Sequence, residues 1–458
     1  MSRYKPYPQY KDSGIEWLGQ VPEHWSIFRM KIAIDIVQNG IWGEDPVGNE
    51  DDILCARVSD FDRNKHTISD NLITLRNVPE NQRKSRIVRT GDLLIEKSGG
   101  GEQTAVGAVV QYTGEASIIC SNFLAIVRCK KNFSERWLCY INEFLYSLGV
   151  NIRSIKQTTG IQNIDSAQYF SEKIPIPQLK DQIKISSHLD RETTRIETLI
   201  EKKSRFIELL QEKRQALLTQ AVTKGLDPNA NLKDSGVKWL GLVPEHWDIL
   251  RLKHISAFIT SGPRGWSDFI NDDGNEIFLQ SGDLNDNLEI LPNTAKRISA
   301  PTGAEAKRTL LEENDIVVCI TGANTGRVAL VKTTSSPIYI NQHLCLIRLQ
   351  AHRLLPKYLT LLLSSHSGRS YFNFTQYGLK EGLSLTNIAT FPIMLPPYEE
   401  QQKICKYIDS INLKYNSLIT ATQRSMELLK ERRAALITAA VTGQIDLPAS
   451  ATGEGEIP

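Results

Sequence analysis

The chain has 458 residues, of which 41% are hydrophobic and 23% charged, a composition typical of a soluble globular protein with two or three domains. No apolar run approaches the roughly 18 residues that a membrane span needs, and the polar N-terminal stretch does not read as a signal peptide. The seven cysteines never form a C-x-x-C pair, which argues for a cytoplasmic protein and against a disulfide framework or a zinc site. A net charge of +2 neither requires nor excludes nucleic acid, so any DNA-binding charge must be gathered on one face.

One segment of the sequence occurs twice. Residues 11–25 read KDSGIEWLGQVPEHW and residues 233–247 read KDSGVKWLGLVPEHW, with twelve of the fifteen positions identical. So long a period excludes a solenoid and predicts two copies of one half, each about the size of a domain. The two tryptophans and the leucine of each copy predict a packing motif, because no nucleophile, base and orienting group come together here.

The first large segment, residues 26–174, is predicted to be a mixed α/β domain. Short β-rich runs alternate with Gly, Asn and Asp turns, and one helical stretch follows. The expected strands are Ile32–Val37, Leu72–Leu75, Asp92–Ile95 and Ile118–Val127, and the expected helix is Trp137–Leu148. Basic residues cluster near Arg83 and Lys130, and the Gly-rich stretch 97–101 follows a strand, where glycines let a backbone approach a polyanion.

A long helix is predicted from residue 178 to residue 224, where neither glycine nor proline occurs. Its apolar residues at helical spacing form a seam that polar residues interrupt. The seam consists of Ile196, Ile200, Ile207, Leu210, Leu217 and Ala221, with Lys203 and Arg214 as the interruptions. Gly225 and Pro228 end the helix. Residues 192–223 alone would span roughly 48 Å, and such a half-apolar helix needs a partner.

The second half of the chain supplies that partner. After a second mixed α/β segment, residues 248–392, a helical run without glycine extends to Thr442 and aligns without a gap with the first helix, so that Gln182 meets Gln401 and Arg214 meets Arg433. Its seam consists of Tyr415, Ile419, Met426, Leu429, Leu436 and Ala440, interrupted by Thr422 and Arg433. The two helices are expected to pack as an antiparallel pair, and residues 443–458 to form a disordered tail.

These residues carry a family resemblance. The paired D-S-G-[IV]-x-W-L-G-x-V-P-E-H-W segments, the Pro-containing run that opens each long helix and the A-V-T that closes it resemble the specificity subunits of type I restriction–modification systems, over nearly the whole chain. The resemblance implies an α+β fold with an internal pseudo-two-fold repeat, in which two target-recognition domains are separated by two long antiparallel helices that act as a coiled-coil ruler. The implied boundaries are 1–25, a conserved segment; 26–175, the first recognition domain; 176–225, the central helix; 226–247, a linker with the repeated segment; 248–395, the second recognition domain; 396–443, the C-terminal helix; and 444–458, the tail.

The same resemblance implies the partners. Each recognition domain would read one half of an asymmetric bipartite site in double-stranded DNA. Two methylation subunits would dock on the helices, and restriction subunits would join the full complex in a bacterial or archaeal cytoplasm. S-adenosylmethionine, ATP and Mg²⁺ are expected in those partner subunits, and this chain is expected to bind no cofactor or metal. The repeated segment 11–25 would complete, around a circle, the unit that the C-terminal helix begins.

Candidate DNA contacts follow from the chemistry of the two segments, because Arg and Lys hold phosphates while Arg, Asn and Gln read bases. In the first segment the candidates are Arg83, Lys84, Arg86, Lys97, Ser98, Lys130, Lys156, Gln157, Gln162 and Asn163. In the second they are Arg264, Trp266, Lys307, Arg308, Asn324, Arg327, Gln342, His343, Lys380 and Asn387. Lys84 and Lys307 occupy matching places and are the strongest phosphate candidates, whereas Trp266 is equally suited to packing a loop.

Other functions leave weaker signals. A DNA adenine methylase would need Asn or Asp before Pro-Pro-Tyr, but Leu395 stands there and cannot bind an amino group. Asp92, Glu96 and Lys97 resemble a metal-nuclease triad only loosely, and the spacing is wrong. The sequence therefore predicts a reader without catalytic residues. Two alternatives remain open, a coiled-coil adaptor that binds no DNA and an orphan specificity subunit without a methylase partner; salt-dependent DNA affinity would exclude the adaptor.

Overall fold

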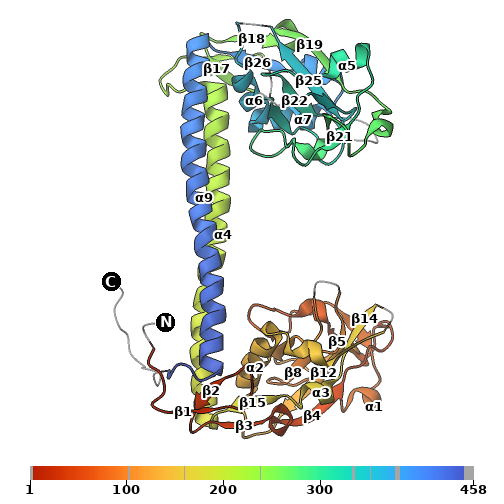
Figure 1. Cartoon of the computed structure of the whole chain (residues 1–458), viewed down its shortest axis with the longest axis vertical. Helices are drawn as coiled ribbons and strands as arrows, with labels where there is room; N and C mark the ends of the chain where they lie inside the picture. Colours follow the sequence, from red (N-terminus) through yellow and green to blue (C-terminus); the bar gives the residue numbers. More distant parts are fainter. Residues whose placement is uncertain are drawn as a thin grey trace. The chain divides into compact units, whose positions relative to one another are not determined.

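The structure is a computed structural model that describes residues 4–101, 104–158, 160–237, 239–332, 336–350, 352–376 and 382–447. The chain divides into two compact units, the first formed by residues 1–204 and 423–458 and the second by residues 205–422. Two long helices, α4 (Leu179–Lys224) and α9 (Tyr398–Val441), each contribute one half to each unit (Figure 1). In the described parts of the chain, no helix is both long and apolar enough to cross a membrane.

The first unit contains an α/β segment between a short hairpin and the start of α4. Its strands are β1 (Tyr10–Asp12), β2 (Gln20–Pro22), β3 (Ser26–Arg29), β4 (Ile34–Asn39), β5 (Asp52–Ala56), β6 (Thr67–Ile68), β7 (Leu75–Asn77), β8 (Leu93–Glu96), β9 (Ser98–Gly99), β10 (Val109–Tyr112), β11 (Ile119–Cys120), β12 (Leu124–Cys129), β13 (Ile155–Thr158), β14 (Ile161–Ile164) and β15 (Lys173–Ile176). Its short helices are α1 (Glu80–Arg83), α2 (Glu135–Ser147) and α3 (Ser166–Tyr169). The main sheet has the order β4-β12-β8-β10-β6, and a smaller one the order β11-β5-β7.

The second unit repeats this arrangement. Its strands are β16 (Leu232–Asp234), β17 (Leu242–Pro244), β18 (Asp248–Arg251), β19 (Ser256–Ser261), β20 (Glu276–Leu279), β21 (Lys296–Ile298), β22 (Ile316–Cys319), β23 (Val328–Leu330), β24 (Ile338–Ile340), β25 (Leu344–Leu349) and β26 (Pro392–Leu395). Its short helices are α5 (Ala304–Thr309), α6 (Pro356–Ser364), α7 (His366–Thr375) and α8 (Leu385–Ala389). The main sheet order β19-β25-β22-β23 matches β4-β12-β8-β10, and β24-β20-β21 matches β11-β5-β7.

Equivalent ion pairs confirm the correspondence of the two α/β segments. The buried Asp92 accepts from Arg128 Nε at 2.7 Å, and the buried Asp315 accepts from Arg348 Nε at 2.8 Å. In both segments the arginine also donates to a backbone carbonyl, so each pair ties β12 or β25 to the loop before the neighbouring strand, β8 or β22. The hydrogen bonds with Asp92 and Asp315 raise the pKa of the two arginines further, and both stay charged.

Some predicted strand limits were wrong. Of the predicted strand Leu72–Leu75, only Leu75 belongs to a strand. The carboxylate of the preceding Asp70 accepts hydrogen bonds from the Tyr112 hydroxyl and from the backbone N–H of Glu115. These bonds hold the chain before residue 75 away from strand pairing. The run Ile118–Val127 is two strands, since a turn closed by Leu124 N and Ser121 O interrupts it. The helix predicted near residues 137–148 is α2.

The repeated segments pack as predicted. Each forms a two-stranded hairpin, β1-β2 or β16-β17, followed by a fully buried tryptophan, Trp25 or Trp247. Gly225 and Gly443, which end α4 and α9 at positive φ, lie against these tryptophans; a Cβ on Gly443 would come within 2.3 Å of Pro22 Cδ. The N-terminal hairpin therefore completes the unit at the end of α9, where Tyr10 donates to Gly443 O.

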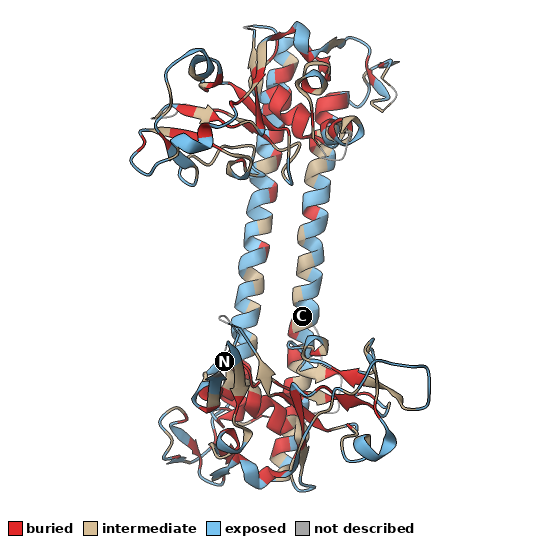
Figure 2. Ribbon diagram, turned by 90° about the vertical axis from the view of Figure 1, so that its right-hand side faces the viewer, coloured by how far each residue is buried: buried red, intermediate tan, exposed pale blue. Residues whose placement is uncertain are grey.

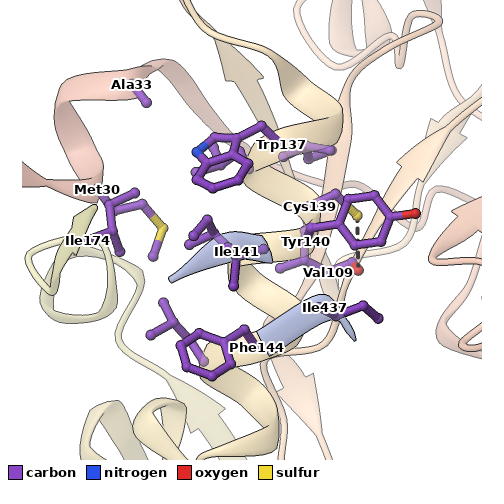
Figure 3. Packing of buried hydrophobic residues seen from close by; sticks show 14 of the residues in the cluster. Met30, Ala33, Val109, Trp137, Cys139, Tyr140, Ile141, Phe144, Ile174 and Ile437 are labelled. Carbon is purple, nitrogen blue, oxygen red and sulfur yellow. Dashed lines mark hydrogen bonds between the residues drawn. The ribbon is translucent and has the colours of Figure 1, made fainter. Parts of the chain in front are cut away.

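Helix α2 is the centre of the first hydrophobic core. Trp137, Ile141 and Phe144 point from α2 toward Met30, Ile174 and, on α9, Ile437 (Figure 3). The core extends beyond α9 to Ile445 and Leu447, which are buried. The disordered tail predicted from residue 443 is therefore wrong for residues 443–447, because these apolar side chains dock on the core; residues 448–458 lie outside the described residues.

The two long helices run antiparallel within each unit. In the first, the N-terminal half of α4 lies beside the C-terminal half of α9, and Glu197 bonds Arg433. In the second, Leu210 and Leu217 pack with Ile411, Tyr415 and Ile419. Exposed residues alternate with half-buried and buried ones along both helices (Figure 2). The predicted fold class, two mixed α/β segments with two long antiparallel helices, is confirmed.

Candidate nucleic-acid interface

A small sheet in the first α/β segment gathers several of the predicted DNA contacts. Its strands pair in the order β13-β14-β9. Lys156 lies opposite Asn163, Gln157 lies opposite Gln162, and Ser98 pairs with Asn163 from the other side. Half of the candidates proposed for this segment thus share one short sheet that the sequence spreads over two distant stretches.

Hydrogen bonds already use part of this polar surface. Ser98 Oγ donates to Asn163 Oδ1, and Gln162 Nε2 donates to Gly101 O at 3.2 Å. Gly100 has a φ of +69°, and a Cβ there would lie 2.8 Å from Gln162 Oε1. The glycine-rich stretch thus serves close packing against β14 as well as any approach to a ligand.

The lysines beside this sheet are also partnered. Lys156 Nζ donates to Asp165 Oδ2 at 2.8 Å, and this hydrogen bond holds the pKa of Asp165 below its usual value. Lys97 Nζ donates to Asn39 Oδ1 at 3.0 Å. Gln157 is exposed and makes no side-chain hydrogen bond with the residues that the structure describes. Of this group, Gln157 is the side chain with its hydrogen-bonding capacity unused.

A cavity of about 460 Å³ adjoins the same sheet. It is lined by Trp42, Arg57, Val58, Ser59, Glu96, Ser98, Gly99, Gly100, Ser121, Asn122 and Phe123. Burial raises the pKa of Glu96, and the charge of Arg63, whose Nη2 lies 3.0 Å from Glu96 Oε2, opposes that rise. The cavity thus combines exposed aromatic rings with a buried carboxylate and polar groups at its mouth.

The cations of the first segment fall into two groups. Arg83 donates to the backbone carbonyls of Asp51, Val78 and Glu50, and Arg86 to that of Gln82, so both hold the local fold. Lys84 and Lys130 are exposed and form no ion pair or side-chain hydrogen bond within the described part of the chain. These two lysines are the cations of this group available to a phosphate.

The second segment shows the same division. Lys307 and Arg264 are exposed and without partners among the described residues. Arg308 donates to Thr260 Oγ1, Arg327 to Leu284 O at 3.2 Å, and Asn324 to Ser281 O at 3.1 Å.

Three further candidates of this segment stand apart from the exposed cations. Trp266 is 4% exposed and packs with Phe278 and Tyr339, so the packing interpretation holds. The Asn387 carboxamide caps α8 by accepting from Ser384 N. Lys380 lies outside the described residues.

Gln342 and His343 occupy the turn before β25. His343 is exposed, and its ring bonds Thr321 Oγ1 through Nδ1 and Gln342 Nε2 through Nε2. The corresponding turn before β12 carries Asn122 and Phe123, which the sequence reasoning missed together with Arg57. Aligning Ser-Asn-Phe-Leu at 121–124 with Asn-Gln-His-Leu at 341–344 would have found the two turn residues.

The predicted seam lies on the covered side of each long helix. Ile196, Leu210 and Leu436 are buried, and the half-buried members are Ile200, Ile207, Leu217, Ile419, Met426 and Leu429. Among the polar interruptions, the two arginines have side-chain partners on neighbouring elements. Arg433 Nη1 lies 2.6 Å from Glu143 Oε1 and Arg433 Nε 3.3 Å from Glu197 Oε1, while Arg214 Nη1 donates to Asn416 Oδ1 at 2.6 Å.

The residues that resembled catalytic motifs have structural roles. Asp92 and Glu96 are each paired with an arginine, Arg128 and Arg63. Leu395 ends β26 and is buried. Across the described ranges, no three His, Cys, Asp or Glu side chains are grouped so as to hold a metal ion.

The chain is similar to several known specificity proteins. The family model of the type I restriction modification DNA specificity domain matches residues 244–428. The StySPI specificity subunit of Salmonella potsdam is 22% identical, with 88% of this chain and 86% of that protein covered. The EcoKI specificity subunit of Escherichia coli K12 is 23% identical, with 86% and 83% covered. The MjaVIII specificity subunit of Methanocaldococcus jannaschii is 20% identical, with 79% and 81% covered.

Solved structures share the fold. A chain from a study of complex assembly and conformational transition of the type I R-M system has a TM-score of 0.71 at 18% identity, covering 93% of this chain and 99% of that one. The HsdS subunit from Thermoanaerobacter tengcongensis has a TM-score of 0.53 at 18% identity, covering 93% and 98%. Together with the duplicated hairpins and the antiparallel helices, these matches make the chain similar over most of its length to the DNA-specificity subunits of type I restriction–modification systems, and residues 244–428 match the DNA specificity domain itself.

Proposed function

We propose that residues 26–175 and 248–395 are target-recognition domains, each reading one half of an asymmetric bipartite site in double-stranded DNA. One observation carries the proposal. The two domains share strand order, register and the Asp92–Arg128 and Asp315–Arg348 pairs, yet differ in the side chains exposed at equivalent positions. A constant frame with a variable exposed surface is what two readers of different base sequences require.

The remaining segments would assemble the complex. We propose that two methylation subunits dock on the helical regions 176–225 and 396–443, that restriction subunits join them in the full complex, and that the helices set the spacer. The segments 1–25 and 226–247 support the helix ends, and residues 444–458 follow as the tail. S-adenosylmethionine, ATP and Mg²⁺ belong to the partner subunits, and the whole complex acts in the cytoplasm.

Phosphate contact is assigned to the free cations. Lys84 and Lys307 lie at equivalent places beside α1 and in α5, both exposed, and Lys130 and Arg264 are exposed as well. The partnered candidates Arg83, Arg86, Arg308 and Arg327 would act by holding the loops in place. Each free cation that contacts a phosphate adds about one unit to the salt dependence of binding.

A map of modified bases tests the proposed function in the host. With the gene present, N6-methyladenine is expected at one asymmetric motif of two short half-sites with a fixed gap. Deleting the gene should remove the modification at that motif alone, because a specificity subunit directs its methylase partners to one target. Unchanged modification, together with no salt-dependent binding of the purified chain to duplex DNA, would contradict the proposal.

Lengthening the helices tests their role as a ruler. Seven residues inserted into α4 between Ile200 and Leu210, with seven into α9 between Ile419 and Met426, preserve the heptad seam. We expect the spacer of the methylated motif to lengthen while both half-sites keep their sequences. A control insertion of Gly-Ser residues after Leu447, beyond the last residue that docks on the core, should leave the motif unchanged. Altered half-sites would contradict a modular reader.

A further inference from the structure

The turns before β12 and β25 are built on the same backbone. Ser121 N donates to Ala56 O at 2.9 Å, and Asn341 N donates to Leu279 O at 3.0 Å. Lys97 N donates to the carbonyl of residue 123 at 2.8 Å, and Ile320 N to that of residue 343 at 2.9 Å. These bonds make residues 122 and 123 structurally equivalent to residues 342 and 343. The pairing of β5 with β11 and of β20 with β24 has the same register, so residue 57, after β5, is equivalent to residue 280, after β20.

A glycine lies in close contact with the backbone of each turn. A Cβ on Gly40 would lie 2.1 Å from Ser121 O, and a Cβ on Gly262 would lie 2.1 Å from Ile340 O. The chain just after β4 and just after β19 therefore packs directly against the backbone of the turn. Such close packing leaves the turn little freedom, so the side chains on it project from a preorganised support.

The three equivalent positions carry different chemistry in the two domains. The pairs are Arg57 and Gln280, Asn122 and Gln342, and Phe123 and His343. Arg57 and Asn122 are exposed at the mouth of the 460 Å³ cavity, and neither side chain has a hydrogen-bond partner among the described residues. Phe123 is 44% exposed beside them. Unused donors next to an exposed ring on a rigid support have no evident role in the fold.

These groups suit the edges of base pairs. A guanidinium can donate in bidentate fashion to guanine O6 and N7, and Asn or Gln carboxamides match adenine N6 and N7. An aromatic ring offers apolar contact to the thymine methyl group. We propose that residues 57, 122 and 123, and their equivalents 280, 342 and 343, form a base-reading set that determines each half-site. This inference rests on the proposed function and names the residues that carry it out.

The test uses the full chain in complex with its methylation subunits and a library of randomised DNA duplexes. With Arg57→Gln, which installs the residue found at position 280, discrimination at one base pair of one half-site should fall by about 5- to 150-fold. The other half-site and the spacer should stay the same. Gln280→Arg should alter one base pair of the other half-site only.

Lys130→Gln is the matched control, because Lys130 is also an exposed cation of the first domain but lies away from the turn, after β12. It should weaken binding to all duplexes alike and leave the selected motif unchanged. Asn122→Gln provides a second variant if Arg57→Gln reduces the folded fraction in a circular dichroism melt. Uniform weakening by both Arg57→Gln and Asn122→Gln would overturn the base-reading set. A wild-type complex that selects no bipartite site would instead refute the proposed function before any variant is compared.

Discussion

Replacing Arg433 by methionine is expected to lower the free energy of unfolding of the unit formed by residues 1–204 and 423–458 by about 3–5 kcal/mol. The Arg433 side chain is 16% exposed and joins α9 to Glu143 of α2 and Glu197 of α4, and it also donates to Asn64 O. Methionine keeps much of the apolar stem but removes the cation. Both carboxylates then lose this partner in a largely buried place, where an uncompensated charge is costly.

Hydrogen exchange of the full chain measures this effect locally. Protection should fall for amides of the first unit and stay constant for residues 205–422. Arg432→Met is the matched control, since Arg432 neighbours Arg433 on α9 but is exposed and has no ion pair with any described residue. That variant should change the unfolding free energy by less than about 0.5 kcal/mol. Equal losses in the two variants would mean that helix propensity, not the buried network, accounts for the change.

The same network predicts acid sensitivity. Burial acts to raise the pKa of Glu143, but the hydrogen bond and charge of His66, with the charge of Arg433, outweigh it and hold the pKa below its usual value. A lowered pKa in the folded state contributes stability that is fully present above the unfolded value of about 4.3 and is lost as pH falls through the folded pKa. Burial raises the pKa of Glu197, which therefore protonates at higher pH and contributes no such loss.

We therefore expect the first unit to lose stability below about pH 4.3, and Glu143→Gln to remove part of that dependence. Urea unfolding between pH 3 and pH 7, followed by exchange in the two units, measures it. An unchanged pH profile in Glu143→Gln would assign acid sensitivity to other carboxylates.

Replacing Gln182 by leucine is expected to cost the first unit about 2–5 kcal/mol. Gln182 is 1% exposed; its Oε1 accepts from Ser134 N at 2.9 Å, and its Nε2 donates to Pro177 O at 2.9 Å. One carboxamide thus supplies hydrogen bonds to a backbone N–H at the start of α2 and to a backbone carbonyl before α4. Leucine has similar volume but leaves a buried N–H and a buried carbonyl unpaired, and each costs about 1–3 kcal/mol.

The second unit offers the equivalent experiment. Gln401 accepts from Leu355 N at 2.8 Å and donates to Pro396 O at 2.9 Å, so Gln401→Leu should destabilise residues 205–422 by a similar amount. Gln211→Leu, at an exposed position of α4, is the control and should be nearly neutral. If Gln182→Leu and Gln211→Leu lower the free energy of unfolding equally, the hydrogen bonds of the Gln182 carboxamide do not hold α4 to the α/β segment.

The helices and hairpins were predictable because their signals are local. A stretch without glycine or proline and with apolar residues at helical spacing specifies a long helix, as α4 and α9 confirm. The seam residues lie on the covered side for the same reason. The strand limits were less predictable, because Asp70 and the turn at Ser121 interrupt β-rich runs through contacts that the sequence pattern does not contain.

The sequence could not distinguish candidate residues that are free to contact DNA from those that form hydrogen bonds within the fold, because both are the same basic or amide residues. Arg83 and Lys84 are neighbours, yet the first holds backbone carbonyls of residues 50 and 51 while the second is free. Trp266 was open to two interpretations, and its contacts with Phe278 and Tyr339 identify it as a core residue.

The sequence by itself determined the duplicated architecture, the two long helices and the equivalence of Gln182 and Gln401 in the two halves. Identity between the halves and helical periodicity are properties of the chain alone. The tertiary structure decided which polar groups remain available and which hold the fold. Availability depends on partners far apart in the chain, as with Arg433 and Glu143, and on backbone equivalence between turns, as at residues 122 and 342. Burial and hydrogen bonding are three-dimensional quantities, so the side chains left free for DNA emerge only when the chain is folded.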